Sequence, residues 1–236
     1  YEKLVKWSKD NPNAVNVCIH KGLFPPEIAS KFPHLLQYSD VRDVGKAAKD
    51  WPQLNFIIYH SGWRWTGPKA PQSAWDHFQK TGRIEWVTDL ADIPAKYGVK
   101  NVYGDLGQLF AWTTTANPRL GAAVMGTLIK GLGTDHVVWG TDAVWTGAPQ
   151  WQIEALRRLE IPEDMQKTYG YKPLGAADGP VKTAIFGDNN ARLYHVNRKQ
   201  QAAIITDRVA QMKEAYEQDG PGRTNMAYGY VNKNPA

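Results

Sequence analysis

The chain has 236 residues, 42% of them apolar and 22% charged, which is the composition of a globular protein rather than a disordered one. The net charge is +5, but the Lys and Arg residues are scattered, so we do not expect nucleic-acid binding, which needs a continuous basic surface. No apolar run approaches the roughly 18 residues of a membrane span, so we expect no membrane contact. The single Cys18 excludes an internal disulfide.

The first residues of the chain carry no visible targeting signal. The sequence begins with Tyr1 rather than Met, and charged residues stand where a secretory signal would have its apolar segment. We therefore expect a further segment to precede Tyr1 in the working protein. The cytoplasm is the favoured location, with the periplasm as the alternative if a removed segment carried a signal.

Four short apolar runs, rich in β-branched and aromatic residues, predict four strands, over residues 14–19, 54–59, 99–103 and 136–139. Stretches compatible with helices follow them, over residues 39–50, 91–97, 118–132 and 150–159. Strands that alternate with helical crossovers are parallel, so the sequence predicts an α/β fold.

A second region follows these strand-helix units. Apolar residues recur at near-helical spacing over residues 204–216, and the remaining residues are rich in Gly, Pro and Asn. We therefore divide the chain into residues 1–199, which hold the strand-helix units, and residues 200–236, which form a C-terminal helix and an extended arm.

Polar side chains recur where the predicted strands end. The series is His20, His60, Asp105 and Asp142, and a glycine lies within two residues of each. Because the carboxyl ends of parallel strands meet at one edge of a sheet, where ligands bind, we expect these four residues to form one site. The alternative is that each one caps a strand or is a hydrogen-bonded core residue, but this does not explain why the pattern repeats beside glycine.

His20, His60 and Asp142 form a ligand set that suits one divalent metal ion, zinc in the first place and manganese as the alternative. A metal lowers the pKa of bound water, and a neighbouring carboxylate can accept the proton. We therefore expect Asp142 to be the proton acceptor and His60 to share the catalytic role.

Residues near these strand ends also predict a substrate pocket. Four tryptophans fall in the loops after strands two to four, namely Trp63, Trp65, Trp112 and Trp145. They favour a substrate with a ring or a planar acyl group, with Arg64 pairing with a carboxylate and Asp105 as a further contact. The alternative, which the sequence favours equally, is that the tryptophans pack helices onto the sheet and that Arg64 is a surface residue.

In these segments the sequence resembles the amidohydrolase superfamily, in its amidohydrolase-2 branch of metal-dependent hydrolases and decarboxylases. The resemblance runs from Val15 to Tyr194 and is strongest over residues 17–22, 56–62, 102–107, 138–142 and 185–194. It implies a (β/α)8 TIM-type barrel of which this chain supplies about strands 5–8, with His20 on strand five, His60 on strand six and Asp142 on strand eight. The family's His-x-His pair on strand one is absent, and its strand-four Lys or Glu has no counterpart.

The resemblance implies metal-dependent hydrolysis of an ester, lactone or amide in a small-molecule substrate, through a metal-activated water. Two alternatives remain: metal-dependent decarboxylation of an aromatic acid, and a non-catalytic half-barrel subunit of a larger assembly. The implied partners are the missing N-terminal half of the barrel, or a chain that supplies it, and further copies in a homo-oligomer.

Overall fold

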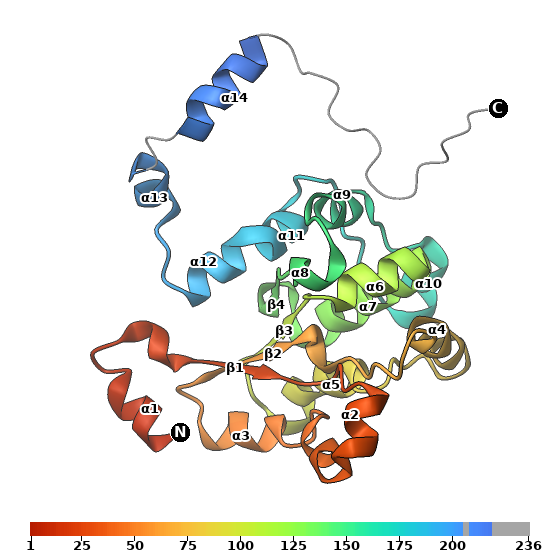
Figure 1. The fold of residues 1–236 in the computed structure, drawn as a ribbon. Coiled ribbons are helices and arrows are strands. Elements are labelled where there is room, and N and C mark those ends of the chain that lie inside the picture. The colour runs from red at the N-terminus through yellow and green to blue at the C-terminus, as the bar shows by residue number, and fades with distance from the viewer. Residues whose placement is uncertain (205–207, 219–236) are drawn as a thin grey trace, which may run out of the picture. The chain divides into compact units, whose positions relative to one another are not determined.

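A computed structural model describes residues 1–204 and 208–218. The chain divides into two compact units, Tyr1–His195 and Val196–Ala236. The first unit contains all four strands, and the second contains α13 (Arg198–Ile204) and α14 (Arg208–Gln218) (Figure 1). The predicted extended arm lies, from residue 219 on, outside the described residues. No helix among the described residues is long and apolar enough to cross a bilayer.

The first unit is built on a parallel sheet, which confirms the predicted α/β class. Its four strands follow the chain in the order β1 (Asn16–His20), β2 (Asn55–Tyr59), β3 (Val102–Asp105) and β4 (Val137–Val138). His20 pairs with Tyr59 and Asp105 with Val138, so the carboxyl ends of the strands lie close to the same edge. In the described part of the chain, β1 and β4 each pair with a single strand.

The helices between the strands agree with the sequence patterns to different degrees. Besides the short α2, described below, they are α3 (Val44–Asp50), α4 (Ala70–Thr81), α5 (Val87–Tyr97), α6 (Leu109–Ala116) and α7 (Pro118–Leu132). The predicted helix over 118–132 is confirmed at both ends, because the Asn117 side chain accepts a hydrogen bond from the Arg119 N–H and Gly133 ends the helix. α4 and α6 were not predicted.

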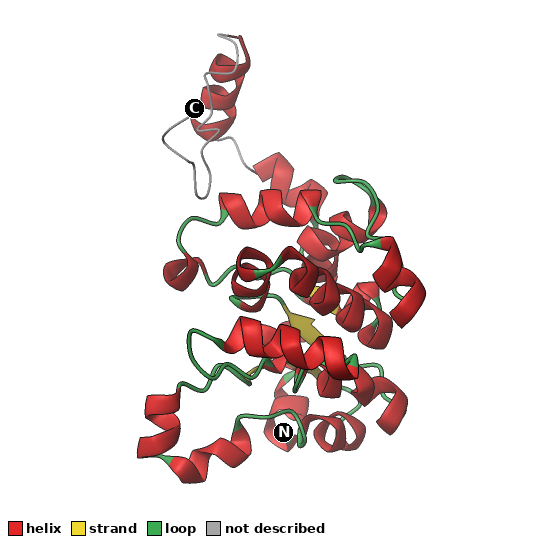
Figure 2. Cartoon of the chain, turned by 90° about the vertical axis from the view of Figure 1, so that its right-hand side faces the viewer, coloured by secondary structure: helices red, strands yellow, loops and turns green. Residues whose placement is uncertain are grey.

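Shorter elements complete the first unit. The α-helices are α1 (Glu2–Trp7), α2 (Pro26–Lys31), α8 (Ala143–Thr146), α9 (Gln150–Arg158), α10 (Glu163–Tyr169), α11 (Pro180–Thr183) and α12 (Asn189–Leu193). Single turns of 3₁₀ or π helix lie at η1 (Pro12–Val15), η2 (Pro33–Tyr38), η3 (His60–Gly62), η4 (Thr134–His136) and η5 (Ala184–Asp188). Figure 2 shows the strands among helices within this unit.

The two faces of the sheet are packed differently. Alternate residues of each strand point to opposite faces, and Phe56, Ile58 and Val137 belong to the large core cluster that also includes residues of α5 and α7. Ile57 and Val138 point to the other face, where they form only a small cluster with Tyr103 and Leu193. This second face carries the side chains of Asn16 and Cys18, which are on the same side of β1 as His20.

Asn101, just before β3, ties the sheet to the segment around α3. Its buried Nδ2 lies 3.1 Å from the carbonyl oxygens of Ala48 and Trp51 and 2.7 Å from that of Leu54. We expect Asn101→Ala to lower the free energy of unfolding by about 3 kcal/mol, because buried carbonyls would lose their donor. Urea denaturation would measure this. An equal loss in the exposed Asn13→Ala would contradict the assignment.

Candidate active site

The four polar residues that follow the strands lie in one cavity of about 740 Å³. His20 ends β1, His60 follows β2 directly, Asp105 ends β3, and Asp142 stands in the loop after β4. Apolar side chains line the same cavity, including Leu23, Ile57, Val138 and Trp139. The site therefore combines imidazole and carboxylate groups with an apolar wall, at the edge of the sheet where parallel α/β proteins bind ligands.

Hydrogen bonds fix the orientation of His60. Its Nδ1 lies 2.8 Å from the carbonyl oxygen of Gly107, so Nδ1 donates and Nε2 keeps a free lone pair. This is the arrangement found for histidines that bind metals, where the second ring nitrogen donates to a carbonyl or carboxylate. Burial lowers the pKa of His60 below its usual value, which favours the neutral ring.

His20 lies against His60, with ring centroids 4.8 Å apart and planes inclined at 72°. Its pKa is also lowered, first by burial and then by the neighbouring His60, while the charge of Asp142 acts in the opposite direction. Within the described part of the chain, neither the His20 ring nor the Asp142 carboxylate takes part in a hydrogen bond. Both groups are thus available to a ligand.

Asp105 is held by backbone groups around it. Its Oδ1 accepts hydrogen bonds from the N–H of Gly107 at 2.9 Å and of His60 at 3.3 Å. A Cβ on Gly140 would lie 2.2 Å from Oδ2, so only glycine leaves room for this carboxyl group. Burial raises the pKa of Asp105 to about 6, and the charge of Asp142 adds to the effect. Asp105 therefore holds the backbone of His60, and because it also lines the cavity, its contact with a substrate stays a prediction.

Unusual backbone conformations concentrate at this edge of the sheet. His60, Ser61, Gln108 and Asp142 all have positive φ, at 57°, 45°, 51° and 51°. For residues other than glycine such values cost energy and are kept only where the surrounding structure enforces them, often at functional sites. One such restraint is the hydrogen bond of 2.8 Å from the Ser61 hydroxyl to the carbonyl of Asp105.

The loops after β1 and β2 lie in direct backbone contact behind the two histidines. Leu23 N–H donates to the carbonyl of Trp63 at 2.9 Å, and Gly22 N–H donates to Ser39 at 2.6 Å. Gly22 has φ +70°, and a Cβ there would lie 2.2 Å from the Trp63 carbonyl oxygen. The spacing of His20 and His60 therefore depends on a glycine at position 22.

The structure does not bring most of the predicted aromatic and cationic substrate contacts into the cavity. Trp63 is 1% exposed and belongs to the core, and Trp112 packs against Trp65 with ring centroids 5.3 Å apart. Arg64 forms an ion pair of 2.5 Å with Glu85 and lies over the ring of Trp86. These positions depend on tertiary contacts that the loop sequence does not reveal. Of the predicted tryptophans, Trp145 does line the cavity.

The cavity also contains residues that sequence reasoning missed, namely Tyr59, Gln108, Asn190 and Tyr194. The Tyr194 hydroxyl lies 3.6 Å from the sulfur of Cys18, although the two residues are 176 positions apart in sequence. A hydrogen bond with Cys18, together with burial, raises the pKa of Tyr59 to about 12, so its phenol is neutral at physiological pH. Strand alternation would have placed Tyr59 beside His20, whereas no local signal identifies Tyr194.

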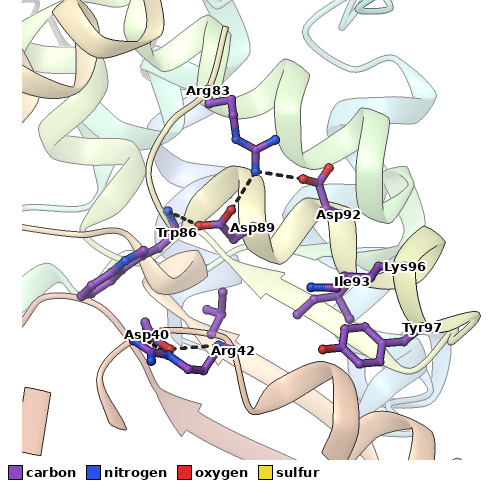
Figure 3. A pocket seen from close by; sticks show the side chains of 10 residues that line it. Asp40, Arg42, Arg83, Trp86, Asp89, Asp92, Ile93, Lys96 and Tyr97 are labelled. Atoms are coloured by element: carbon purple, nitrogen blue, oxygen red, sulfur yellow. Dashed lines mark hydrogen bonds and ion pairs between the residues drawn. The ribbon is translucent and has the colours of Figure 1, made fainter. Parts of the chain in front are cut away.

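A second cavity, of about 470 Å³, lies beside α5 and contains none of the strand-end residues (Figure 3). Apart from Lys96, which lies over the ring of Tyr97, its charged groups are paired with one another. Arg83 contacts Asp89 at 2.7 Å and Asp92 at 2.9 Å, and Asp40 pairs with Arg42. With these charges neutralised, the cavity offers less to a reacting substrate than the cavity at the strand ends.

The residues at the strand ends were tested for their fit to a divalent ion. Neutral imidazoles and a carboxylate are suitable donors, and Nε2 of His60 is free. His60 and Asp142 both lie close to Gly107, since a Cβ there would be 3.6 Å from both His60 Nδ1 and Asp142 Cβ. In the described residues, no three His, Cys, Asp or Glu side chains already form a metal-binding group. The donors therefore fit a divalent ion in kind and share one cavity, but their side chains do not yet converge on one point.

A search of curated proteins found no match to this chain. Among solved structures, it is similar to 5-carboxyvanillate decarboxylase from Sphingomonas paucimobilis, with 18% identity over 78% of this chain and 50% of that one and a TM-score of 0.39. It is also similar to 2,6-dihydroxybenzoate decarboxylase from Rhizobium, with 15% identity over 82% and 55% of the two chains and a TM-score of 0.40.

A third similar structure is dihydroxybenzoic acid decarboxylase from Polaromonas sp. JS666, with bound manganese and the inhibitor 2-nitroresorcinol. Its identity is 15%, over 83% of this chain and 54% of that one, and its TM-score is 0.38. The chain spans about half the length of these structures. Such weak likeness bears on neither the substrate nor the metal of this chain.

The match of this chain to a family model is stronger evidence than its likeness to these solved structures. The model of the amidohydrolase family matches residues 12–196, a range that contains all four strands and the four strand-end residues. The resemblance inferred from the sequence motifs is thereby confirmed, and the chain belongs to the amidohydrolase family.

Proposed function

We propose that this chain carries the metal-binding and proton-accepting residues of a hydrolase that cleaves an ester, lactone or amide. The observation that supports this most is the His20–His60 pair, in which the hydrogen bond from Nδ1 of His60 to Gly107 leaves Nε2 free beside the His20 ring. The family to which the chain belongs is metal-dependent. His20, His60 and Asp142 would hold one divalent ion, zinc or manganese.

When bound, the ion lowers the pKa of a water molecule and polarises the oxygen of the scissile group. The Asp142 carboxylate is free of hydrogen bonds in the described residues and accepts the proton of the attacking water. The His60 ring keeps its orientation through its hydrogen bond to the Gly107 carbonyl. Asp105 in turn accepts hydrogen bonds from the backbone N–H groups of His60 and Gly107. The apolar wall formed by Ile57 and Val138 excludes water from one side of the substrate.

Decarboxylation of an aromatic acid is the second candidate within the same cavity. The apolar and aromatic wall, with Ile57, Val138 and Trp139, suits a planar ring as well as it suits an acyl group. In that reaction a protonated Asp142 would deliver its proton to the ring carbon that loses CO₂. The two reactions use the same residues and differ in the product.

We also propose that residues 1–199 form strands 5–8 of a (β/α)8 barrel. Three observations support this. The order of strands and helices is that of a barrel half, β1 and β4 each have one strand neighbour among the described residues, and the second sheet face carries a small apolar cluster. Unpaired edge strands tend to pair with another segment, here a preceding part of the barrel or another chain.

The proposed function predicts metal-dependent turnover with a defined product. Full-length protein loaded with Mn²⁺ or Zn²⁺ would be incubated with phenyl esters, aryl lactones and hydroxybenzoates, and the products followed by mass spectrometry. We expect an acid to be released from an ester or lactone without CO₂, and we expect removal of the metal with dipicolinate to abolish turnover and re-addition to restore it.

Two outcomes would change this conclusion. Release of CO₂ from a hydroxybenzoate without hydrolysis of any ester would establish the second candidate. Turnover that survives complete removal of the metal, checked by elemental analysis of the same sample, would contradict both.

A further inference from the structure

Two phenols that line the cavity, with a thiol beside them, lie on the second face of the sheet and are not used by the proposed chemistry. The Tyr194 hydroxyl is 3.6 Å from the sulfur of Cys18, and Tyr59 follows Ile57, the register partner of Cys18, by two residues on the same face. Tyr59 and Tyr194 both line the cavity, and they remain 39% and 37% exposed, so a ligand can reach them. We call Tyr59, Tyr194 and Cys18 the phenol cluster.

The phenol cluster lies at a different level of the sheet from the candidate metal ligands. Cys18 precedes His20 by two residues on the same side of β1, which corresponds to about 6.6 Å along a parallel strand. Tyr59 pairs with His20 in the strand register, whereas the Tyr194 hydroxyl contacts Cys18. The Tyr194 oxygen therefore lies deeper on the sheet face than the imidazoles, toward the start of the strands, and Tyr59 belongs to the same face on the neighbouring strand.

The cavity is lined on this face by Ile57, which is level with Cys18, and by Val138, which is level with Asp105. Both are 2% exposed and lie on the same face as the phenol cluster. A flat apolar group fits against these side chains, with one polar end at the imidazoles and the other at the phenols. A substrate with a wholly apolar far end would leave both phenol groups in contact with hydrocarbon, which is unfavourable.

We infer that Tyr59 and Tyr194 are specificity-determining residues that bind an oxygen substituent, a hydroxyl or carboxylate, on the far side of an aromatic ring from the bond that is broken. The inference rests on the proposed function, since it assigns the substrate class of the same cavity. A phenol both donates and accepts a hydrogen bond, and the contact with Cys18 limits where the Tyr194 hydroxyl points.

The test compares two probes that differ in one hydroxyl group, 4-hydroxybenzoate and benzoate. Their dissociation constants would be measured by titration calorimetry on the full-length, Mn²⁺-loaded protein and on the Tyr59→Phe and Tyr194→Phe variants. We expect the parent to bind 4-hydroxybenzoate about tenfold more tightly than benzoate, and each variant to reduce that ratio at least about threefold. Affinity for benzoate itself should change little.

Tyr38→Phe is the matched control, because Tyr38 is 62% exposed and does not line the cavity, so its affinity ratio should equal that of the parent. If the phenols are only structural, both probes weaken together and the ratio stays constant, which overturns the inference but not the proposed function. If the parent binds neither probe at millimolar concentration, the inference is overturned, whereas the proposed function is decided separately by the product screen.

Discussion

Asp142→Asn should lower kcat by about 10³-fold, within the range for loss of a general base or acid, with little effect on folding. Asn has nearly the size of Asp but cannot accept the proton of the attacking water. Asp142 has positive φ, at 51°, a conformation that Asn tolerates better than most residues, so the loop after β4 should keep its structure. Steady-state kinetics on the substrate found in the product screen would measure the effect.

The metal content of Asp142→Asn must be measured in the same samples, because Asp142 is also a candidate ligand. Asp89→Asn is the control, since Asp89 pairs with Arg83 outside the strand-end cavity. Parent-like turnover by metal-loaded Asp142→Asn would refute the catalytic assignment. If deletion of residues 219–236 then dissociated an active complex of this chain with another chain, this chain would be better described as a non-catalytic half-barrel subunit.

Gly22→Ala should lower the free energy of unfolding by about 4 kcal/mol and displace the two histidines from one another. The added Cβ would lie 2.2 Å from the Trp63 carbonyl oxygen and 2.5 Å from the Gly62 carbonyl carbon. Both are backbone atoms, so no side-chain rotation can relieve the contact. The cost combines about 1–2 kcal/mol for alanine in the left-handed region with about 1–3 kcal/mol for overpacking.

The Gly98→Ala variant separates the cost of a left-handed alanine from the cost of overpacking. Gly98 has φ +67°, close to the +70° of Gly22, but a Cβ there would meet nothing within 4 Å. This variant should therefore lose only about 1 kcal/mol and keep full activity. Urea denaturation followed by circular dichroism would compare the two. Equal losses would show that the loops behind His20 and His60 are less tightly packed than the structure indicates.

The strand-helix order of the first unit could be predicted because its strands are short apolar runs bounded by polar or turn-forming residues. The helix over 118–132 was predicted most accurately, since Asn117, Pro118 and Gly133 mark its ends. α4 was missed because its sequence is mostly polar, and Ala70 and Phe78 are its only buried residues. β4 is shorter than the predicted run because His136 belongs to η4, where its Nε2 hydrogen-bonds to the Lys100 carbonyl.

The gathering of His20, His60, Asp105 and Asp142 in one cavity could be predicted because strand direction alone brings the ends of parallel strands together. The role of Asp105 could not, since it depends on the backbone path through Gly107 and on the space left by Gly140. Likewise, the partners of Arg64 and Tyr194 come from distant parts of the sequence. Positions that depend on such contacts require the folded structure.

The most direct test of the account is an anomalous difference map from crystals of the full-length protein grown with Mn²⁺ or Zn²⁺. The account predicts one strong peak in the strand-end cavity, within bonding distance of Nε2 of His60, an imidazole nitrogen of His20 and the Asp142 carboxylate, at roughly 2.0–2.2 Å for zinc. An empty cavity in crystals that contain the metal elsewhere, or a peak that contacts none of these three residues, would contradict it.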